Sequence, residues 1–433
     1  MALSKQPYKG ARDFYPEDKR LQKYLFNTMR NVVERFGYEE YDAPILEPLE
    51  LYKAKTGEEI VNEQTYTFTD RGDRQVAIRP EMTPTVSRMV AAKRQELTYP
   101  LRWYSIPNLW RYERPQRGRL REHWQLNVDI FGVAGPEAEH EVISMADSIM
   151  TTFGAKHDMY TIRLNSRKLS DYLLQEHLKF DHEQSRSLTK LIDRMHKISA
   201  SDFSEQVDDL LTDTQRHAKA DKALMAVLNA TSIAELPPEL HDHKSVEELK
   251  KLFELLKSSG VTNAVFDPSL MRGFDYYTDI VFEVFDTDPE NNRSMFGGGR
   301  YDGLVGLFGV DSVPTVGFGL GDVTLQNFLG SHKLLPALRP ETDLWVVLIG
   351  ATYERAQGVL NEMRDAGLNV ALDSTGRKTD KQLKAALKKG IKYALFIGEK
   401  ELEKGEYTLK NLETVKETKQ SIDEVIKLVS ERA

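Results

Sequence analysis

The sequence contains no cysteine among its 433 residues. Without thiols the chain forms no disulfide and offers no thiolate to a metal, which fits a reducing compartment. Long hydrophobic runs are also missing: no stretch approaches the roughly 18 apolar residues that a membrane helix needs, and the N-terminus lacks the apolar core of a signal peptide. We therefore expect a cytoplasmic protein that has no membrane partner.

Positive charge is in deficit, because 59 Lys and Arg residues face 67 Asp and Glu residues and the net charge is −8. Any contact with nucleic acid must therefore use local basic patches. One patch lies between Arg377 and Lys392, with seven basic residues against one Asp, and its alternative interpretation is a solvated helix face. The other, which could also be a solvated hairpin tip, consists of five arginines within eleven residues: Arg111, Arg114, Arg117, Arg119 and Arg121.

The chain is long enough for roughly two to four domains. A helix is predicted from Pro16 to Phe36 by apolar residues at helical spacing. Charged amphipathic helical patterns occupy residues 168–262. Strand-like stretches precede and follow them, and their serial order favours an antiparallel sheet in an α+β fold with a helical insertion. These stretches are residues 64–70, 75–81, 101–113, 122–132, 271–286, 294–309 and 315–329.

Strands and helices alternate regularly beyond a linker at residues 331–340. Residues 341–433 are therefore predicted to form a small α/β domain with a mainly parallel sheet. Ser421 and Glu424 have capping-box spacing at the start of its last helix. The chain is thereby divided into residues 1–167, the insertion 168–262, residues 263–330, the linker and this last domain.

One predicted strand, "HWQLNVDIFG" from His123, has an apolar back and a polar front. Because side chains alternate along a strand, Gln125, Asn127 and Asp129 share one face, which suits a small cationic ligand as well as it suits a solvated surface. The glycines of "MFGGGRYDGL", from Met295, permit close approach of a ligand to the backbone. They form neither a P-loop nor a dinucleotide fingerprint.

The motifs together resemble those of the histidyl-tRNA synthetases, which are class II aminoacyl-tRNA synthetases. "RGFDYY" from Arg272 and "GGGRYDGL" from Gly297 resemble the two histidine signatures of that family. "YDAPILEP" resembles motif one, which forms the dimer interface, and "LWRYERPQRGR" with "HWQLNVDIFG" resembles motif two. "VGFGLGD" resembles the start of motif three, and the order of motifs matches over nearly the whole chain, including a C-terminal anticodon-binding domain.

The resemblance implies a homodimeric enzyme that uses ATP and Mg²⁺ to join L-histidine to the histidine tRNA through histidyl-adenylate. It implies Arg272 and Arg111 as catalytic residues at the reacting carboxylate and α-phosphate. A neutral imidazole offers one donor and one acceptor, which Asp129 and Tyr277 can meet. The histidine-binding residues would be Glu81, Thr83, Gln125, Asp129, Tyr276, Tyr277 and Tyr301. The ATP-binding residues would be Arg111, Glu113, Arg119, Arg121 and Arg300. The tRNA-binding residues would be Arg114, Gln116 and Arg117 at the acceptor end, and Arg377, Lys378 and Lys381 near the anticodon.

The sequence departs from the family pattern at two places. Asp129 stands where the family more often has Glu, so the pocket must tighten or use a water. Thr324 stands where motif three usually has the arginine for the ATP γ-phosphate, and we expect another arginine, foremost Arg119 or Arg121, to replace it. Two alternatives stay open: a regulatory subunit of ATP phosphoribosyltransferase in histidine biosynthesis, and a sensor of uncharged tRNA. No metal ligand is predicted, since the histidines of "HDH" at 241–243 fit a solvated loop.

Overall fold

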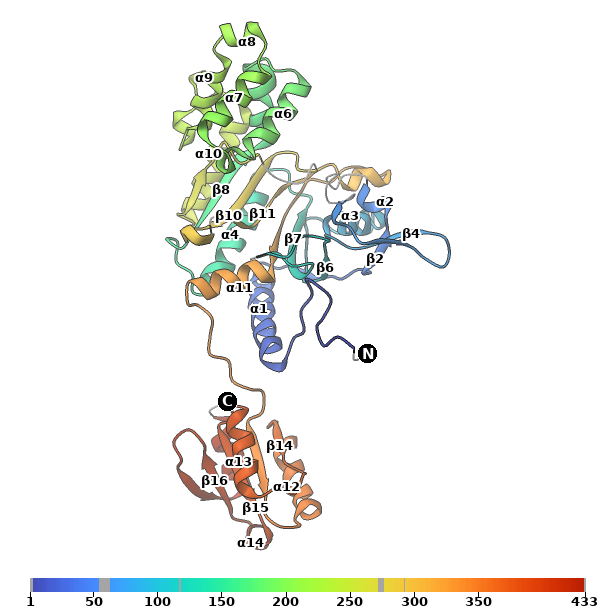
Figure 1. Cartoon of the computed structure of the whole chain (residues 1–433), viewed down its shortest axis with the longest axis vertical. Coiled ribbons are helices and arrows are strands. Elements are labelled where there is room, and N and C mark those ends of the chain that lie inside the picture. The colour runs from blue at the N-terminus through green and yellow to red at the C-terminus, as the bar shows by residue number, and fades with distance from the viewer. Residues whose placement is uncertain (1–2, 54–62, 117, 272–275, 292, 432–433) are drawn as a thin grey trace. The chain divides into compact units, whose positions relative to one another are not determined.

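The computed structural model describes residues 3–53, 63–116, 118–271, 276–291 and 293–431 (Figure 1). The chain forms two compact units. Unit 1 comprises Met1–Asp13 and Gln22–Leu335, and unit 2 comprises Phe14–Leu21 and Pro336–Ala433. None of the helices in the described ranges is both long and apolar enough to cross a membrane.

Unit 1 is built on a sheet that has nine strands in the described residues. Its order is β1-β5-β7-β12-β11-β10-β8-β9, with β6 paired to β7. All neighbours are antiparallel except β1 with β5 and β8 with β9. This confirms the predicted α+β fold. The strands are β1 (Glu39–Glu40), β5 (Leu101–Ser105), β6 (Asn108–Trp110), β7 (Glu122–Phe131), β8 (Tyr160–Ser166), β9 (Ala264–Phe266), β10 (Ile280–Asp286), β11 (Ser294–Arg300) and β12 (Thr315–Gly321).

Several helices of unit 1 were not predicted from the sequence. They are α3 (Thr83–Ala92), α4 (Glu137–Thr152) and α11 (Asp322–Ser331), whereas the predicted first helix is α1 (Pro16–Arg35). The expectation of strand over all of 315–329 was wrong, because the strand ends at Gly321 and α11 begins with Asp322. Buried Leu325, Phe328 and Leu329 have helical spacing, and this apolar stripe packs on the sheet.

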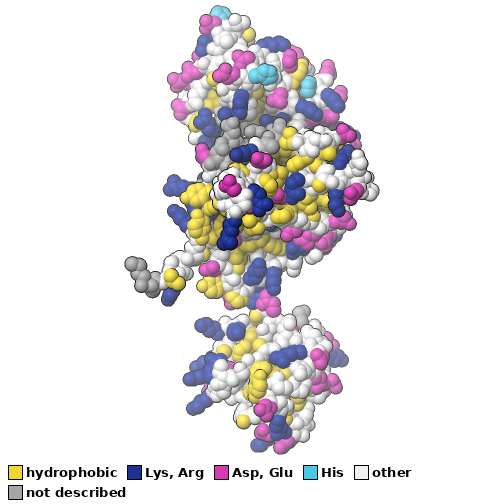
Figure 2. Space-filling model, turned by 90° about the vertical axis from the view of Figure 1, so that its right-hand side faces the viewer, with side chains coloured by type: hydrophobic (Ala, Val, Ile, Leu, Met, Phe, Trp, Pro, Cys, Tyr) yellow, Lys and Arg dark blue, Asp and Glu magenta, His cyan; other side chains and the backbone are white. Residues whose placement is uncertain are grey.

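A small second sheet, β2-β4-β3, also belongs to unit 1. It contains β2 (Leu46–Pro48), β3 (Thr67–Thr69) and β4 (Gln75–Ile78), with the short helix α2 (Glu50–Lys53) following β2. Ile45, Leu46 and Phe68 here are each 45% exposed. Figure 2 shows one face of the chain, on which hydrophobic side chains lie exposed between Lys and Arg side chains.

The segment between β8 and β9 is mainly helical, as predicted. Figure 1 shows α6, α7, α8 and α9 gathered into one bundle. His243 caps α10 through its ring and packs on Tyr172, with ring centroids 4.3 Å apart, so this histidine belongs to a helix start. The helices are α5 (Arg167–Asp171), α6 (His182–Ile192), α7 (Ala200–Leu210), α8 (Asp213–His217), α9 (Ala220–Leu228) and α10 (Lys244–Ser258).

Unit 2 contains a five-stranded sheet in the order β14-β13-β15-β16-β17. β13 pairs in parallel with β14 and β15, but β16 and β17 are antiparallel, so the expectation of a mainly parallel sheet is corrected to a mixed one. The capping box of Ser421 and Glu424 is confirmed. The strands are β13 (Leu344–Leu348), β14 (Val370–Leu372), β15 (Tyr393–Ile397), β16 (Tyr407–Asn411) and β17 (Glu417–Gln420), and the helices are α12 (Tyr353–Asp365), α13 (Thr379–Lys388), α14 (Glu399–Lys404) and α15 (Ile422–Ser430).

Candidate active site

A cavity of about 950 Å³ opens over one face of the main sheet of unit 1. Strand register defines this face. On β12, Gly317 pairs with Asp129 and Gly319 with Asn127 of β7, and on β11 Gly299 and Gly297 pair with the same two glycines. Paired residues share a face, so these four glycines lie on one face of the sheet, and Gly297, Gly317 and Gly319 line the cavity beside polar side chains of β7.

The glycines are required by the closeness of their neighbours. A Cβ at Gly319 would lie 2.7 Å from Gln125 Nε2, and one at Gly317 would collide with Asp129 Oδ1 and the Val128 carbonyl oxygen. Any side chain at these two positions would therefore displace the polar groups of β7. The glycine-rich sequence keeps the floor low so that a ligand can lie between the flanking side chains.

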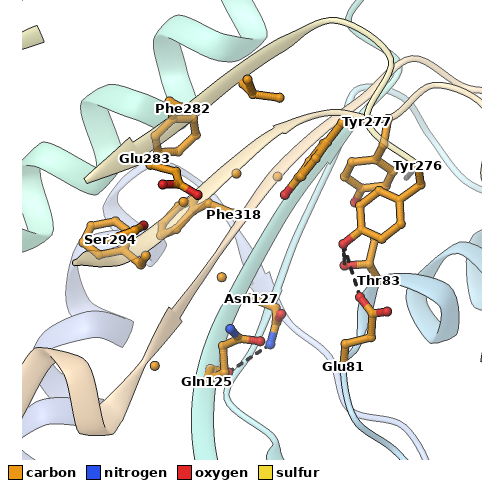
Figure 3. A pocket seen from close by; sticks show the side chains of 18 of the residues that line it. Glu81, Thr83, Gln125, Asn127, Tyr276, Tyr277, Phe282, Glu283, Ser294 and Phe318 are labelled. Atoms are coloured by element: carbon orange, nitrogen blue, oxygen red, sulfur yellow. Dashed lines mark hydrogen bonds between the residues drawn. The ribbon is translucent and has the colours of Figure 1, made fainter. Parts of the chain in front are cut away.

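Tyr276 organises one side of the cavity from the segment that precedes β10. Its hydroxyl donates to Glu81 Oε2 at 3.2 Å and lies 3.4 Å from Thr83 Oγ1. Figure 3 shows these two contacts, with Gln125 and Asn127 nearby on β7 and Glu283 and Ser294 farther along the cavity. The ring centroids of Tyr276 and Tyr277 are 5.0 Å apart. The tyrosine thereby holds a carboxylate and a hydroxyl, both suited to an ammonium group.

Asp129, like Glu81, is a buried carboxylate of the cavity, with 4% of its surface exposed. The Tyr301 hydroxyl donates to its Oδ1. Burial raises the pKa of Asp129 from 3.8 to about 7, and the hydrogen bond from Tyr301 opposes this rise. Burial also raises the pKa of Tyr277, which stays a neutral phenol. Near neutral pH Asp129 can hence accept a proton or give one up to a ligand.

A cationic side of the cavity comes from the segment after β6. Arg111 Nε donates to the Pro80 carbonyl oxygen at 2.9 Å, which fixes the guanidinium. Burial, together with the charges of Arg111 and Arg12, lowers the pKa of His123 to about 3, so this histidine is neutral. Arg119 Nη1 lies 3.5 Å from Glu113 Oε2, and the Arg119 side chain is 55% exposed. A fixed arginine and a more exposed one thus both line the cavity.

Thr324 lies in the first turn of α11, on the cavity lining. Its hydroxyl donates to the Gly321 carbonyl oxygen at 3.0 Å. A Cβ at Gly118 would lie 3.6 Å from Thr324 Cγ2, so the turn that carries Gly118 packs beside Thr324. Asp322 does not face a ligand, because Arg12 Nη2 at 2.7 Å and the Trp124 backbone N–H at 3.0 Å both bind its carboxylate.

Cations of the helical insertion also line the cavity, and sequence reasoning missed them. They are Arg167 on α5 with Arg186 and Lys190 on α6. His182, Arg186 and Lys190 recur every four residues, which places them on one side of α6. This spacing was visible in the sequence, but it is also typical of an ordinary solvated helix. Gln64 and Glu283 are further lining residues that were not predicted.

Two of the predicted ATP-binding arginines do not line the cavity. Arg121 donates to the Tyr8 hydroxyl at 3.0 Å and to the Glu113 carbonyl at 3.1 Å, and its guanidinium stacks 3.9 Å from the Tyr112 ring centroid. Arg300 forms a buried ion pair with Glu139 of α4, with hydrogen bonds of 2.6 and 2.7 Å. Both guanidinium groups are thus held by neighbouring residues and are not part of the cavity lining.

The remaining predicted residues are divided between the two units. Arg272 and Arg117 lie outside the described residues. Arg114 and Gln116 are exposed, and Arg293 donates to Gln116 Oε1 at 3.2 Å. In unit 2, Arg377 pairs with Asp373, while Lys378 and Lys381 are exposed at the start of α13. The other predicted residues line the cavity: Glu81, Thr83, Arg111, Glu113, Arg119, Gln125, Asp129, Tyr276, Tyr277 and Tyr301.

The arrangement suits a reaction between a small zwitterion and a polyanion. Glu81, Thr83 and Asp129 offer acceptors to cationic groups, and Arg111 and Arg119 offer charge to phosphates. No residue of this set needs to become a covalent nucleophile. The cavity can therefore hold two substrates and stabilise the charge that develops as they react.

Comparison with known proteins finds, for both units, the family that the sequence motifs resemble. The family model of histidyl-tRNA synthetase matches residues 10–323, and that of the anticodon binding domain matches residues 343–432. A histidine–tRNA ligase of Leptospira biflexa serovar Patoc is 45% identical over 432 residues, or 99% of this chain and 98% of that protein. That of Thermoplasma volcanium is 38% identical over 94% of both chains. The crystal structure of histidyl-tRNA synthetase from Nostoc sp. PCC 7120 has a similar fold, with a TM-score of 0.83, 24% identity and full coverage of both chains.

Proposed function

The chain belongs to the histidyl-tRNA synthetase family, and we propose that the cavity of unit 1 is where it activates histidine. The chain is a class II aminoacyl-tRNA synthetase that ligates L-histidine to the histidine tRNA, with ATP as substrate and histidyl-adenylate as intermediate. Full-length identity to ligases favours this activity over a regulatory subunit of histidine biosynthesis and over a tRNA sensor.

Histidine would bind with its ring at Asp129 and its α-amino group at Glu81. The pairing of Asp129 with Tyr301, and the pKa of Asp129 near 7, support the first placement, because an imidazole titrates in the same range. The contacts of Tyr276 with Glu81 and Thr83 support the second. Gln125 would add an amide oxygen for the ammonium, and Tyr277 would face the other ring nitrogen.

In the first step, an oxygen of the histidine carboxylate attacks the α-phosphorus of ATP. A new oxygen–phosphorus bond forms as the bond from the α-phosphorus to the bridging oxygen breaks, and pyrophosphate leaves with the electron pair. Arg111, held by its bond to Pro80, is proposed to stabilise the charge on the α-phosphate. Arg272 keeps the catalytic role that the family resemblance implies. Glu113 is proposed to contact the adenine.

Arg119 is proposed to bind the γ-phosphate in place of the missing motif-three arginine. Three observations support it: its partly exposed side chain lines the cavity, its turn packs beside Thr324, and Arg121 is held elsewhere. Among the described residues, the cations of α5 and α6 offer further charge on the same lining. The long side chain of an arginine on a turn can bring its guanidinium to the terminal phosphate, whose charge Thr324 cannot neutralise.

Mg²⁺ is proposed to arrive on the phosphates of ATP. In the described part of the chain no three His, Asp or Glu residues are grouped as a metal site. Mg²⁺ takes most of its ligands from phosphate and water and needs only one or two carboxylates from the protein, so separate carboxylates on the cavity lining are sufficient. Of the lining carboxylates, Asp171 and Glu283 lie outside the sets proposed for histidine and adenine and would be the ones to hold it. When bound, the ion adds positive charge at the phosphates.

In the second step, a hydroxyl oxygen of the terminal ribose of the tRNA attacks the carbonyl carbon of the adenylate; an ester bond forms, the bond from that carbon to the phosphate oxygen breaks, and AMP leaves while the hydroxyl proton is lost. We propose that the hairpin around Arg114, Gln116 and Arg117 contacts the acceptor end. The exposed lysines at the start of α13, Lys378 and Lys381, would contact the anticodon region together with Arg377. Local basic segments are what an acidic protein needs in order to bind a polyanion.

A homodimer is proposed through the segment 41–48. Ile45 and Leu46 are each 45% exposed there, and Leu307 and Phe308, 48% and 39% exposed, line a second cavity of about 330 Å³ with Pro48. Exposed apolar side chains of this kind are typical of an interface. Sedimentation should give twice the chain mass, and an active monomer would contradict the proposal. The cytoplasm, where tRNA is charged, is the proposed location.

The hydrogen-bonded pair of Asp129 and Tyr301 in a cavity lined by Glu81 and Arg111 carries this proposal most directly. It is tested by histidine-dependent exchange of pyrophosphate into ATP. We expect exchange with histidine and none with other amino acids. A protein that binds histidine but shows no exchange at saturating ATP and Mg²⁺ would contradict the placement of ATP and favour the regulatory alternative.

A further inference from the structure

Three hydroxyl groups lie around Asp129: two come from the β5 side, and one, that of Tyr301, binds the oxygen that lies against Gly317. On β5, Trp103 pairs with Asp129 and Ser105 with Asn127, so Ser105 stands on the cavity face diagonally beside Asp129. Tyr41 follows β1, which runs parallel to β5, and its N–H donates to the Tyr104 carbonyl oxygen at 2.8 Å. This continues the pairing by one residue and brings Tyr41 beside Ser105. The third hydroxyl is that of Tyr301.

Two of these hydroxyls are buried and lie beside one another, at a geometry too poor for an ordinary hydrogen bond. Tyr41 Oη and Ser105 Oγ are both inaccessible, and neither has a partner of ordinary length and angle within the described residues. The Tyr41 ring packs on Trp103 with centroids 5.6 Å apart, so a change of rotamer would cost that contact. Buried hydroxyls are nearly always satisfied by protein or by ordered water.

Asp129 and these hydroxyls lie close enough to influence one another. Burial raises the pKa of Tyr41 well above its usual value, the charge of Asp129 adds to the rise, and the Ser105 hydroxyl acts against it. Burial and the charge of Asp129 also raise the pKa values of Tyr301, Tyr277 and Tyr38. The charge of Arg79 lowers the pKa of Tyr41, so the groups around Asp129 combine tyrosine hydroxyls with a nearby arginine.

We propose that Tyr41 and Ser105 are positioning residues for histidine selection: together they hold one water molecule against Asp129. This rests on the proposed placement of the histidine ring at Asp129. A buried water needs two to four polar partners, and the two hydroxyls with Asp129 provide three. Tyr301 donates to Oδ1, which lies against Gly317, and the water, on the β5 side, would donate to Oδ2. Oδ2 keeps a second lone pair for an N–H of the imidazole.

The water explains how the short side chain of Asp129 can present its carboxylate to the histidine ring in a fixed orientation. Asp129 carries its carboxylate on a single methylene, so Tyr301 alone fixes only one oxygen and leaves the carboxylate free to turn about its last bond. A second donor, on Oδ2, fixes that rotation and aims the remaining lone pair of Oδ2 at the ring. An amino acid without a ring N–H would leave this lone pair buried and without a donor, which is how a polar site rejects it.

Three variants test the proposal in the full-length protein: Tyr41→Phe, Ser105→Ala and the double variant. Tyr104→Phe is the matched control, since it removes a hydroxyl from the same strand on the opposite face, where it donates to Glu34 at 2.7 Å. In pyrophosphate exchange, each single variant should raise the KM for histidine about tenfold and leave the KM for ATP nearly unchanged. The double variant should be no worse than the more damaging single one, because either loss releases the same water.

The pH profile adds a readout that a structural role would not move. Loss of a donor to a carboxylate raises its pKa, so the acid limb of kcat/KM for histidine should move to higher pH in the variants and stay in place in Tyr104→Phe. Fold-changes that multiply in the double variant, equal rises of KM for histidine and ATP, or no change at all would overturn the proposal. If the unmodified protein itself shows no exchange, the placement of the substrates fails instead.

Discussion

Replacing Asp129 by Asn should make the empty enzyme more stable while it weakens histidine binding. Burial raises the pKa of Asp129 from 3.8 to about 7. At 1.36 kcal/mol per unit, the ionised carboxylate then costs the empty fold about 4 kcal/mol above pH 7. Asn has the same shape, carries no charge at any of these pH values, and still accepts the hydrogen bond from Tyr301 through its Oδ1.

The sign of the pH dependence follows from the raised pKa. The folded wild type binds the proton of Asp129 more tightly than the unfolded chain, so its contribution is complete below pH 3.8 and is lost as the pH rises through about 7. Asp129→Asn should thus gain stability relative to wild type between pH 4 and 7, and the gain should level off near pH 8. Unfolding by urea, followed by tryptophan fluorescence, measures the difference; Trp103 is the cross-strand neighbour of Asp129.

Histidine provides the second half of this test. Saturating histidine should restore stability to the wild type, by roughly 2.7 kcal/mol at a hundredfold excess over Kd, and much less to the variant. Calorimetry should show histidine affinity reduced about tenfold or more in Asp129→Asn, with ATP binding unchanged. If the variant is instead less stable than wild type by an amount that does not vary with pH, Asp129 is an ordinary structural carboxylate and the reasoning is refuted.

Three further outcomes are expected. Gly317→Ala should abolish histidine activation by displacing the carboxylate next to it, whereas Gly303→Ala, where nothing lies within 4 Å of a new Cβ, should be nearly silent in the exchange assay. Arg119→Ala should raise the KM for ATP and spare histidine, while Arg121→Ala should lower thermal stability more than it changes either KM; the reverse pattern would reassign the γ-phosphate contact. Lys381→Ala should weaken charging of tRNA and reduce its salt slope by roughly 0.7 to 0.9 while exchange stays intact, and equal loss in both assays would contradict an anticodon role.

The alternation of side chains along β7 could be predicted from sequence. Gln125, Asn127 and Asp129 line the cavity. The other face of the strand is apolar and must be buried, so only one register of the strand is compatible with the sequence. The same rule, applied to β11, would have excluded Arg300 from the cavity. Arg300 is adjacent to Gly299, so the two point to opposite faces, and Arg300 reaches Glu139 on α4. The error came from treating a glycine-rich motif as one unit when its residues alternate.

Partners that are distant in the sequence could not be predicted in this way. Tyr301 meets Asp129 across 172 positions, and Arg121 meets Tyr8 across 113. An arginine or a tyrosine side chain can bind either a ligand or a neighbouring residue of the protein. Only the order and register of the strands decide which of these partners it contacts. The family resemblance named Asp129 and Tyr301 as histidine-binding residues without pairing them. It carried no information about Tyr41 and Ser105, which become neighbours through the parallel pairing of β1 with β5.

The origin of the charges in the cavity explains how an acidic chain accommodates ATP. Glu81 and Asp129, the carboxylates proposed to receive histidine, come from the end of the β4 segment and from β7, which are parts of the sheet region. Arg111 follows β6 of the sheet, but the other lining cations come from segments outside the sheet, the hairpin with Arg119 and the insertion helices with Arg167, Arg186 and Lys190. A hairpin and an inserted helix can change their charged residues without altering the sheet register that positions histidine. Part of the recognition of ATP is therefore structurally independent of the recognition of histidine. Loss of one arginine in motif three can then be offset by cations from these segments, with the histidine side of the cavity left unchanged.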